Sequence, residues 1–172
     1  ISQYVDSDQF TVSLSEPTST RHIVLNTTHE ILGDKAVRQA LQHATNREAI
    51  SEGIFYGLEK PADTLYATSV PYCDVDLEPY VYDTSIAEQM LDEAGWVMSS
   101  DGIREKEGQK LELDLLYNSD SVTEKTIAEY LQSEYQKLGI SLNIHGEEEQ
   151  SYRDNMKAGN FDMVFNICWG MP

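Results

Sequence analysis

Basic residues are scarce in this sequence, because 12 lysines and arginines stand against 30 aspartates and glutamates, for a formal net charge of -18. Such an excess of negative charge repels phosphate backbones and anionic lipid headgroups, so we expect no binding to nucleic acid or to a membrane surface. No apolar run is long enough to cross a bilayer, and we expect no direct membrane insertion by this segment. The charge names no ligand, because a solubilising shell explains it without one.

Glycine and proline are also few, with 10 and 5 residues in 172, while hydrophobic residues make up 40%. Disorder and low complexity are therefore not indicated, and a chain of this size can bury a core. We expect a single domain over residues 1–172. The sequence starts at Ile1 with no signal-peptide pattern and stops at Pro172 just after an apolar run, so we expect a segment excised from a longer protein.

Only two cysteines occur, Cys73 and Cys168, and neither belongs to a C-x-x-C or mixed cysteine and histidine motif. They permit one disulfide, but the sequence does not place their Cα atoms within bridging reach. A Cys73–Cys168 bridge and two free thiols therefore both remain open, with free thiols favoured.

Motifs that carry chemistry are missing as well: the sequence has no G-x-S-x-G, P-loop, G-x-G-x-x-G or H-E-x-x-H. We therefore expect no enzyme. The alternating carboxylates of Asp74, Asp76 and Glu78 lack the Gly and Glu that a calcium loop requires. The histidines lack paired metal-ligand spacing, and we expect His145 to be an ordinary polar residue at a strand end. No metal site and no cofactor are predicted.

The clearest structural pattern spans residues 20–56, where a strand precedes two capped helices. The run His22–Asn26 is β-branched and aliphatic and too short for a helix, so it predicts a buried strand. Asp34 and Asn46 are placed as the N-caps of two successive helices, and Gly57 follows the second. Their apolar stripes are Val37, Ala40, Leu41 and Ala44 on the first helix, and Ile50 and Ile54 on the second.

Less regular segments flank this region. Residues Phe10–Leu14 predict a short edge strand or a linker. Three prolines and the lack of a helical stripe predict a long surface excursion over Glu59–Tyr82. A third helix is predicted to begin at Asp83 and to end at Gly95, where Trp96 packs back on the helix in a Schellman motif.

From Leu111 onward, helices and strands alternate. Strands are predicted at 111–117, 140–144 and 161–168, the last being an apolar run covered on both faces. A helix opened by a Ser121 and Glu124 capping box and a second, shorter helix separate them. The order β-α-β-α-β predicts an α/β fold, a three-layer-like mixed sheet with helices in which some strands are parallel.

One place in this pattern suggests a binding site, the residues Cys168, Trp169 and Gly170 after the last strand. In open α/β sheets ligands collect beyond the carboxyl ends of strands, where main-chain groups are no longer paired. Trp169 offers an aromatic face, and neighbouring N–H and C=O groups can pair with an extended peptide as another strand would. The alternative is that Trp169 belongs to the core, and the residues alone leave the two readings about even.

A family resemblance runs along almost the whole chain. The pattern D-x-x-V-R-Q-A-L-x-x-A-x-N-R-E-A-I at residues 34–50 resembles the large two-lobed extracytoplasmic solute-binding proteins of peptide and nickel ABC importers. Further matches follow in the same order: Lys60-Pro61-Ala62, Val70-Pro71-Tyr72, Ala94-Gly95-Trp96 and Trp169-Gly170-Met171-Pro172. The run 60–83 is more similar to the nickel-binding branch than to general peptide binders.

This resemblance implies one lobe of a type II periplasmic-binding-protein-like fold, with ligand buried when two lobes close. It places the W-G-x-P turn in the cleft, so Trp169, Gly170 and, more weakly, Cys168 are the ligand-binding residues. The implied ligand is a nickel chelate or an oligopeptide, and the implied partner is an ABC permease, reached through the full-length protein. The implied location is extracytoplasmic, in the periplasm or as a cell-surface lipoprotein. The alternative is a stand-alone regulatory or protein-interaction domain with no transport ligand.

Overall fold

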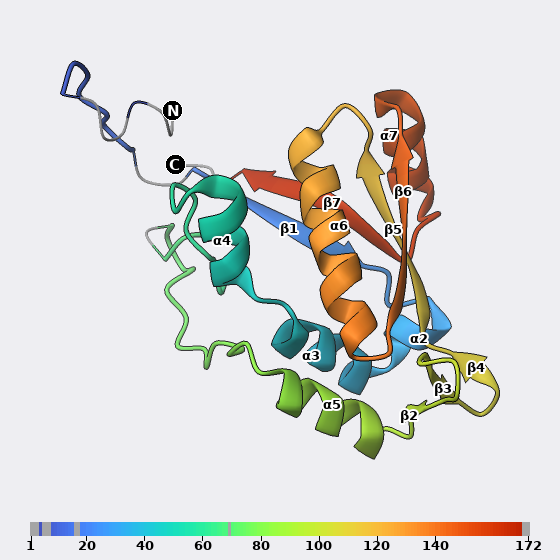
Figure 1. Ribbon diagram of the computed structural model, residues 1–172. Coiled ribbons are helices and arrows are strands. Elements are labelled where there is room, and N and C mark those ends of the chain that lie inside the picture. The colour runs from blue at the N-terminus through green and yellow to red at the C-terminus, as the bar shows by residue number, and fades with distance from the viewer. Residues whose placement is uncertain (1–3, 5–7, 16–17, 69, 170–172) are drawn as a thin grey trace.

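The frame of the molecule is a mixed four-stranded sheet in the order β1-β7-β5-β6, seen in a computed structural model that describes residues 4, 8–15, 18–68 and 70–169 (Figure 1). β5 (Glu112–Asn118) runs parallel to both β6 (Ser141–Glu147) and β7 (Met163–Trp169). β1 (Ser19–Leu25) pairs antiparallel with β7. The predicted mixed sheet with parallel strands is confirmed.

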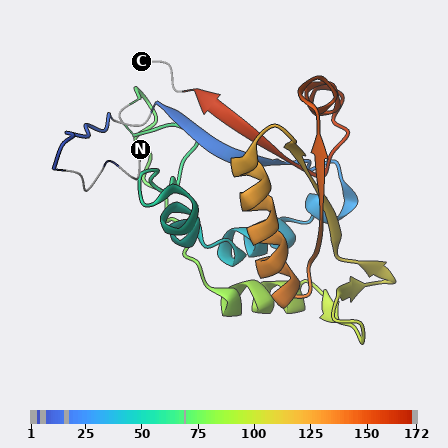
Figure 2. The same cartoon turned by 45° about the horizontal axis from the view of Figure 1, so that its top comes forward.

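Helices cover both faces of this sheet, as Figures 1 and 2 show. α6 (Val122–Lys137) lies on one face, with α4 (Arg47–Phe55) against it and α3 (Lys35–Ala44) packed on α5 (Thr84–Glu93). α7 (Glu149–Ala158) packs on the other face through a small cluster of Leu116, Tyr152 and Val164. The larger core lies under α3, α5 and α6, so the arrangement has the three layers that the pattern predicts.

The predicted helix starts are confirmed by their hydrogen bonds. The side chain of Asp34 accepts from the N–H of Ala36 at 2.9 Å, and that of Asn46 accepts from the N–H of Ala49 at 2.9 Å. These bonds satisfy N–H groups that the first helical turn leaves without partners. Asp83 caps α5 in the same way.

The end of α5 also follows the prediction. Gly95 has a φ of 90°, and the N–H of Trp96 donates to the carbonyl of Leu91 at 2.9 Å, the long bond of a Schellman motif. The N–H of Gly95 donates to Asp92 at 3.0 Å, which is the second bond of that motif. Trp96 is only 2% exposed, so its role here is structural.

Only one of the two hydrogen bonds predicted for the capping box of α6 is confirmed. Ser121 accepts from the N–H of Glu124 at 3.2 Å, as predicted. The carboxylate of Glu124, however, accepts from the N–H of Asn118 at the end of β5 and not from that of Ser121. The N–H of Ser121 is already bonded to the carbonyl of Asn118, so Glu124 ties the helix start to the strand before it.

The sequence pattern did not predict the shortest helix and strands. They are α2 (Glu30–Gly33) and a separate antiparallel sheet of β2 (Val97–Met98), β3 (Arg104–Lys106) and β4 (Gln109–Lys110). Segments of two to four residues are too short to show a period. Residues Phe10–Leu14 form no strand, so the linker reading holds, and the described residues of the 59–82 excursion contain neither helix nor strand.

Two burial predictions are wrong. β1 is an edge strand and is half-buried along most of its length, not fully buried. β7 is covered on both faces only from Met163 to Phe165, because β5 pairs with it only at Met163 and Val164. Beyond that point β1 and β7 continue as a two-stranded ribbon that diverges from the sheet (Figure 1).

Candidate functional site

The predicted site residues lie at the far end of this ribbon. Trp169 is the last residue of β7, lies opposite Ser19 of β1 and is 68% exposed, so it does not belong to the core. Cys168 lies opposite Thr20 and is half-buried. Gly170 falls outside the described residues. The prediction that this backbone lies beyond the ladder is wrong on the side that faces β1.

The other edge of β7 is open. Its register with β5 ends at Val164, and no strand in the described part of the chain lies along this edge from Phe165 to Trp169. The carbonyl of Phe165 is taken by the hydroxyl of Tyr152 from α7. The N–H of Ile167 is also taken, because it donates to the side chain of Asn166 at 2.9 Å. The other main-chain groups of this stretch are of the kind that an extended peptide recognises by strand addition.

The two faces of the ribbon end carry different neighbours. Because side chains alternate along a strand, Ile167 and Trp169 share one face, together with Arg21, which lies opposite Ile167. The guanidinium of Arg21 lies 5.7 Å above the ring of Phe55 in α4 and 3.8 Å from the carboxylate of Glu59. The end of α4 and the start of the excursion therefore border the face on which Trp169 lies.

Cys168 points to the opposite face, where the excursion returns to the sheet. A hydrogen bond between the hydroxyl of Tyr66 and the Cys168 thiol raises the pKa of Tyr66 above its ordinary value, and Cys73 adds to this shift. Cys73 and Cys168 are both free thiols, as favoured from the sequence. Tyr66 was not predicted, because nothing in a proline-rich excursion indicates which of its tyrosines meets a strand.

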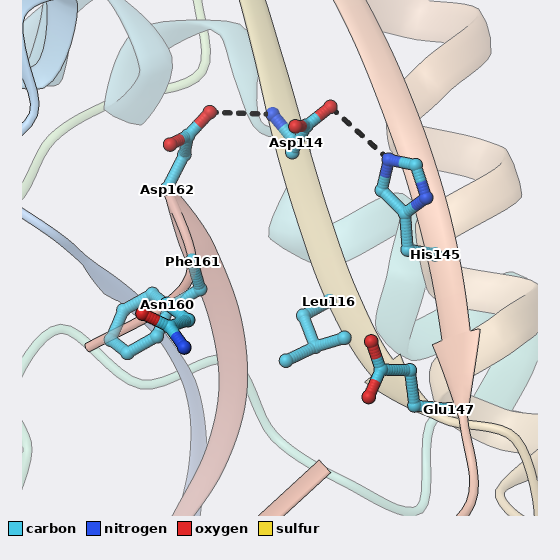
Figure 3. Close-up of a pocket in the computed structure, with 7 residues that line it drawn as sticks. All are labelled: Asp114, Leu116, His145, Glu147, Asn160, Phe161 and Asp162. Atoms are coloured by element: carbon cyan, nitrogen blue, oxygen red, sulfur yellow. Dashed lines mark hydrogen bonds and ion pairs between the residues drawn. The ribbon is translucent and has the colours of Figure 1, made fainter. Parts of the chain in front are cut away.

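A separate hollow opens near the other end of β7 and has a volume of ≈ 370 Å³ (Figure 3). Met163 and Trp169 are six positions apart in the strand, so the two places are about 20 Å apart along it. The hollow is lined by Asp114, Leu116, His145, Glu147, Asn160, Phe161 and Asp162. We call it the acidic hollow, since three of these side chains are carboxylates.

The carboxylates of the acidic hollow are committed to internal partners. Asp162 accepts from the main-chain N–H of Asp114 at 2.9 Å and lies 3.3 Å from Nε2 of His29. Asp114 in turn lies 3.1 Å from Nε2 of His145, as Figure 3 shows. These bonds tie β5, β6 and the start of β7 together, and His145 lies within β6, not at its end.

In the described residues, no group of three or more His, Cys, Asp or Glu side chains is arranged to hold a metal ion. The sequence did not indicate the acidic hollow, because Asp114, His145 and Asp162 come from three separate elements. The exposed aromatic face and the open strand edge at Trp169 therefore remain the better candidate for a site.

The family profile of the bacterial extracellular solute-binding proteins, family 5 (middle part), matches residues 1–171. The chain belongs to this family. The predicted resemblance is confirmed.

Individual relatives fit this assignment. The nickel-binding periplasmic protein of Escherichia coli (strain K12) is 34% identical over 171 residues, which are 99% of this chain and 33% of that protein. The oligopeptide-binding protein AppA of Bacillus subtilis (strain 168) is 31% identical over 147 residues, 82% of this chain and 26% of its own length. The chain thus spans about a third of these relatives or less.

Among solved structures, NikA from Brucella suis in complex with Fe(III)-EDTA superposes with a TM-score of 0.88 at 43% identity. The match covers 93% of this chain and 32% of that one. The fold is therefore that of a periplasmic binding protein, as predicted. Family members are extracytoplasmic solute-binding proteins of ABC importers rather than enzymes. In the described residues, no helix combines the length and apolar character needed to cross a membrane.

Proposed function

We propose that this chain is one lobe, residues 1–172, of a two-lobed solute-binding protein that captures a nickel chelate and delivers it to an ABC permease. The observation that carries this proposal is the exposed Trp169 at the carboxyl end of β7, next to an unpaired strand edge. The choice of cargo is supported by relatives that are named for nickel or were solved with a metal chelate. The nickel is cargo and not a resident cofactor.

In this proposal Trp169 supplies a flat face against which the organic part of the chelate packs. Gly170 is assigned to the same binding site by the family resemblance alone, and Cys168 contributes more weakly, because its thiol faces Tyr66. The second lobe, which this chain does not contain, closes over the ligand. The ribbon suits this closure: Ser19 lies opposite Trp169, so two lobes joined through β1 and β7 are linked by adjacent strands that can bend together.

A short peptide is the second candidate ligand. The open edge of β7 offers main-chain donors and acceptors for an extended peptide, and the AppA relative is named for oligopeptides. A stand-alone interaction domain is not favoured, because the family match covers nearly the whole chain. We place the full-length protein in the periplasm or, as a lipoprotein, at the cell surface.

The test is calorimetric titration of the full-length protein with nickel plus histidine and, separately, with a pool of short peptides. Saturable heat with nickel plus histidine alone supports the chelate, and heat with peptides alone replaces it by the second candidate. The absence of saturable heat with both ligands overturns the transport function. The isolated segment is expected to give no saturable heat, because one lobe supplies only part of the contacts needed to offset the entropy of association.

A matched pair of variants locates the site. Trp169→Ala in the full-length protein should raise the Kd of the ligand about 30-fold, as expected when an aromatic anchor worth about 2 kcal/mol is lost. Val97→Ala is the control, since Val97 is a comparably exposed side chain on β2 of the separate small sheet. An unchanged Kd for Trp169→Ala would remove this residue from the site.

A further inference from the structure

The tip of the 59–82 excursion holds a tyrosine in a conformation that suits glycine. Residues 70–73 form a tight turn in which the N–H of Cys73 donates to the carbonyl of Val70 at 3.0 Å. Pro71 takes the second position, and Tyr72 takes the third with a φ of 67°. In a turn with proline second and a positive φ third, glycine is the usual third residue, because a Cβ there is strained.

No contact with another described residue compensates for this strain, since the Tyr72 side chain is fully exposed. Tyr56, at the end of α4, repeats the combination: it is largely exposed and has a φ of 55°. Only one other non-glycine residue among those described has a positive φ, Glu107 in a hairpin turn. Residues held in unfavourable backbone conformations with their aromatic rings in solvent suggest a contact that lies outside the lobe.

These tyrosines belong to a larger exposed apolar surface around the end of the β1–β7 ribbon. Figures 1 and 2 both show the excursion, which carries Tyr66 and Tyr72, passing the end of β7. We define the tyrosine surface by the exposed side chains Tyr56, Leu65, Tyr66 and Tyr72, and it excludes Trp169, which faces the ligand in the function proposed above. An exposed aromatic cluster of this kind is typical of an interface.

We propose that the tyrosine surface packs against the other lobe of the same polypeptide, with Tyr72 as its anchor. The proposal rests on the two-lobed protein proposed above. The chain spans about a third of its curated relatives, so in a protein of that size most of the polypeptide is available to cover this surface. The excursion that carries most of this surface passes the pair Ser19 and Trp169, where β1 begins and β7 ends (Figure 1). The contact would lie beside the hinge, where it holds through opening and closing.

Hydroxyl-radical footprinting of ligand-free protein tests this proposal by comparing the isolated segment with the full-length protein. The oxidation rates of Tyr72 and Tyr56 should be lower in the full-length protein by a factor of about five or more, because an interface core excludes solvent. Met98 in the small β2–β4 sheet is the internal control and should react equally in both, since it is half exposed and outside the tyrosine surface. Equal reactivity of Tyr72 in both proteins overturns the proposal.

A second arm uses Tyr72→Gly, which keeps the turn and removes the ring. The isolated segment should keep its Tm, because glycine accepts a positive φ without strain. The full-length variant should lose the protection of Tyr56. Protection that appears only at high protein concentration would identify a second copy as the occupant and overturn the proposal. The ligand titrations test the transport function separately. If neither ligand gives saturable heat while Tyr72 is protected in the full-length protein, the transport function is rejected and the contact between the lobes is still supported.

Discussion

The hydroxyl of Tyr152 donates a hydrogen bond to the main-chain carbonyl of Phe165, one residue beyond the last β7 residue that pairs with β5. α7 thus provides a partner at the point where β5 no longer does. The ring of Tyr152 packs with Leu116 and Val164 at the same place. The two strands that lead to Trp169 therefore separate from the sheet at a position that this side chain stabilises.

Tyr152→Phe removes this bond and keeps the ring. A buried carbonyl left without a partner costs about 1–3 kcal/mol, so the free energy of unfolding should fall by that amount in urea titrations. Tyr130→Phe is the control, because Tyr130 lies on α6, partly exposed, and should change stability by less than about 0.5 kcal/mol. A Tyr152→Phe variant as stable as this control would show that the hydroxyl does not hold the ribbon.

The buried side chain of Tyr135 should make the free energy of unfolding depend on pH in the alkaline range. Its side chain is 2% exposed, and burial raises its pKa to about 12. The unfolded chain loses the proton near pH 10 while the folded protein retains it, so stability falls as the pH rises from 10 to 12. One such tyrosine accounts for about 2.7 kcal/mol over those two pH units.

Urea unfolding at several pH values checks this prediction. The wild-type stability should fall more steeply above pH 10 than that of Tyr135→Phe, by about 1.4 kcal/mol per pH unit. Below pH 9 the two curves should run parallel, because the tyrosine is neutral in both states. Burial also raises the pKa of Tyr152 to about 12, so part of the steep fall should remain in the variant. Parallel curves up to pH 12 would contradict the assignment.

Local chemistry explains which parts of the fold the sequence predicts. N-caps such as Asp34 and Asp83 and the helix end at Gly95 depend on neighbouring residues, and all three were predicted correctly. The pairing of β1 with β7 joins residues far apart in the chain, and no local pattern determines where β5 stops pairing. The burial of both strands was mispredicted for this reason.

The candidate site divides in the same way. Trp169 and Cys168 follow from their position at the end of an apolar strand, and the structure places both at the end of the ribbon. The contact of Cys168 with Tyr66 bridges about 100 residues of chain, and a proline-rich excursion has no period to predict it. The strain at Tyr72 depends on a backbone angle that the sequence leaves open, although Pro71 already indicates a turn.

Asp83 is the N-cap most easily tested. Its carboxylate accepts from the N–H groups of Ser85, at 2.8 Å, and Ile86, at 3.3 Å. Asp83→Ala leaves both without this acceptor and should lower the free energy of unfolding by about 1 kcal/mol. Asp83→Asn retains a carbonyl oxygen at the same place and should recover most of the loss. If both variants lose the same amount, the carboxylate charge and not the cap is responsible.

Gly139 combines a positive φ with a close approach, and the two effects can be separated. Its φ is +77°, and a Cβ there would lie 2.8 Å from the Met98 side chain and 2.9 Å from Cγ of Arg104. Gly159, at the end of α7, has a φ of +73° with nothing within 4 Å of a Cβ. Gly159→Ala should therefore cost only the backbone strain, about 1–2 kcal/mol.

Gly139→Ala should cost that strain plus about 1–3 kcal/mol for displacing neighbours that are already packed. Urea unfolding of the two variants gives the comparison directly. The added Cβ pushes on the stem of Arg104, whose guanidinium bonds the carbonyls of Trp96 and Leu138, so the helix ends and the small sheet should loosen together. Faster amide exchange at Trp96 in Gly139→Ala, and not in Gly159→Ala, would show this coupling. Equal losses of stability in the two variants would show that Met98 moves aside freely and that only the backbone angle matters.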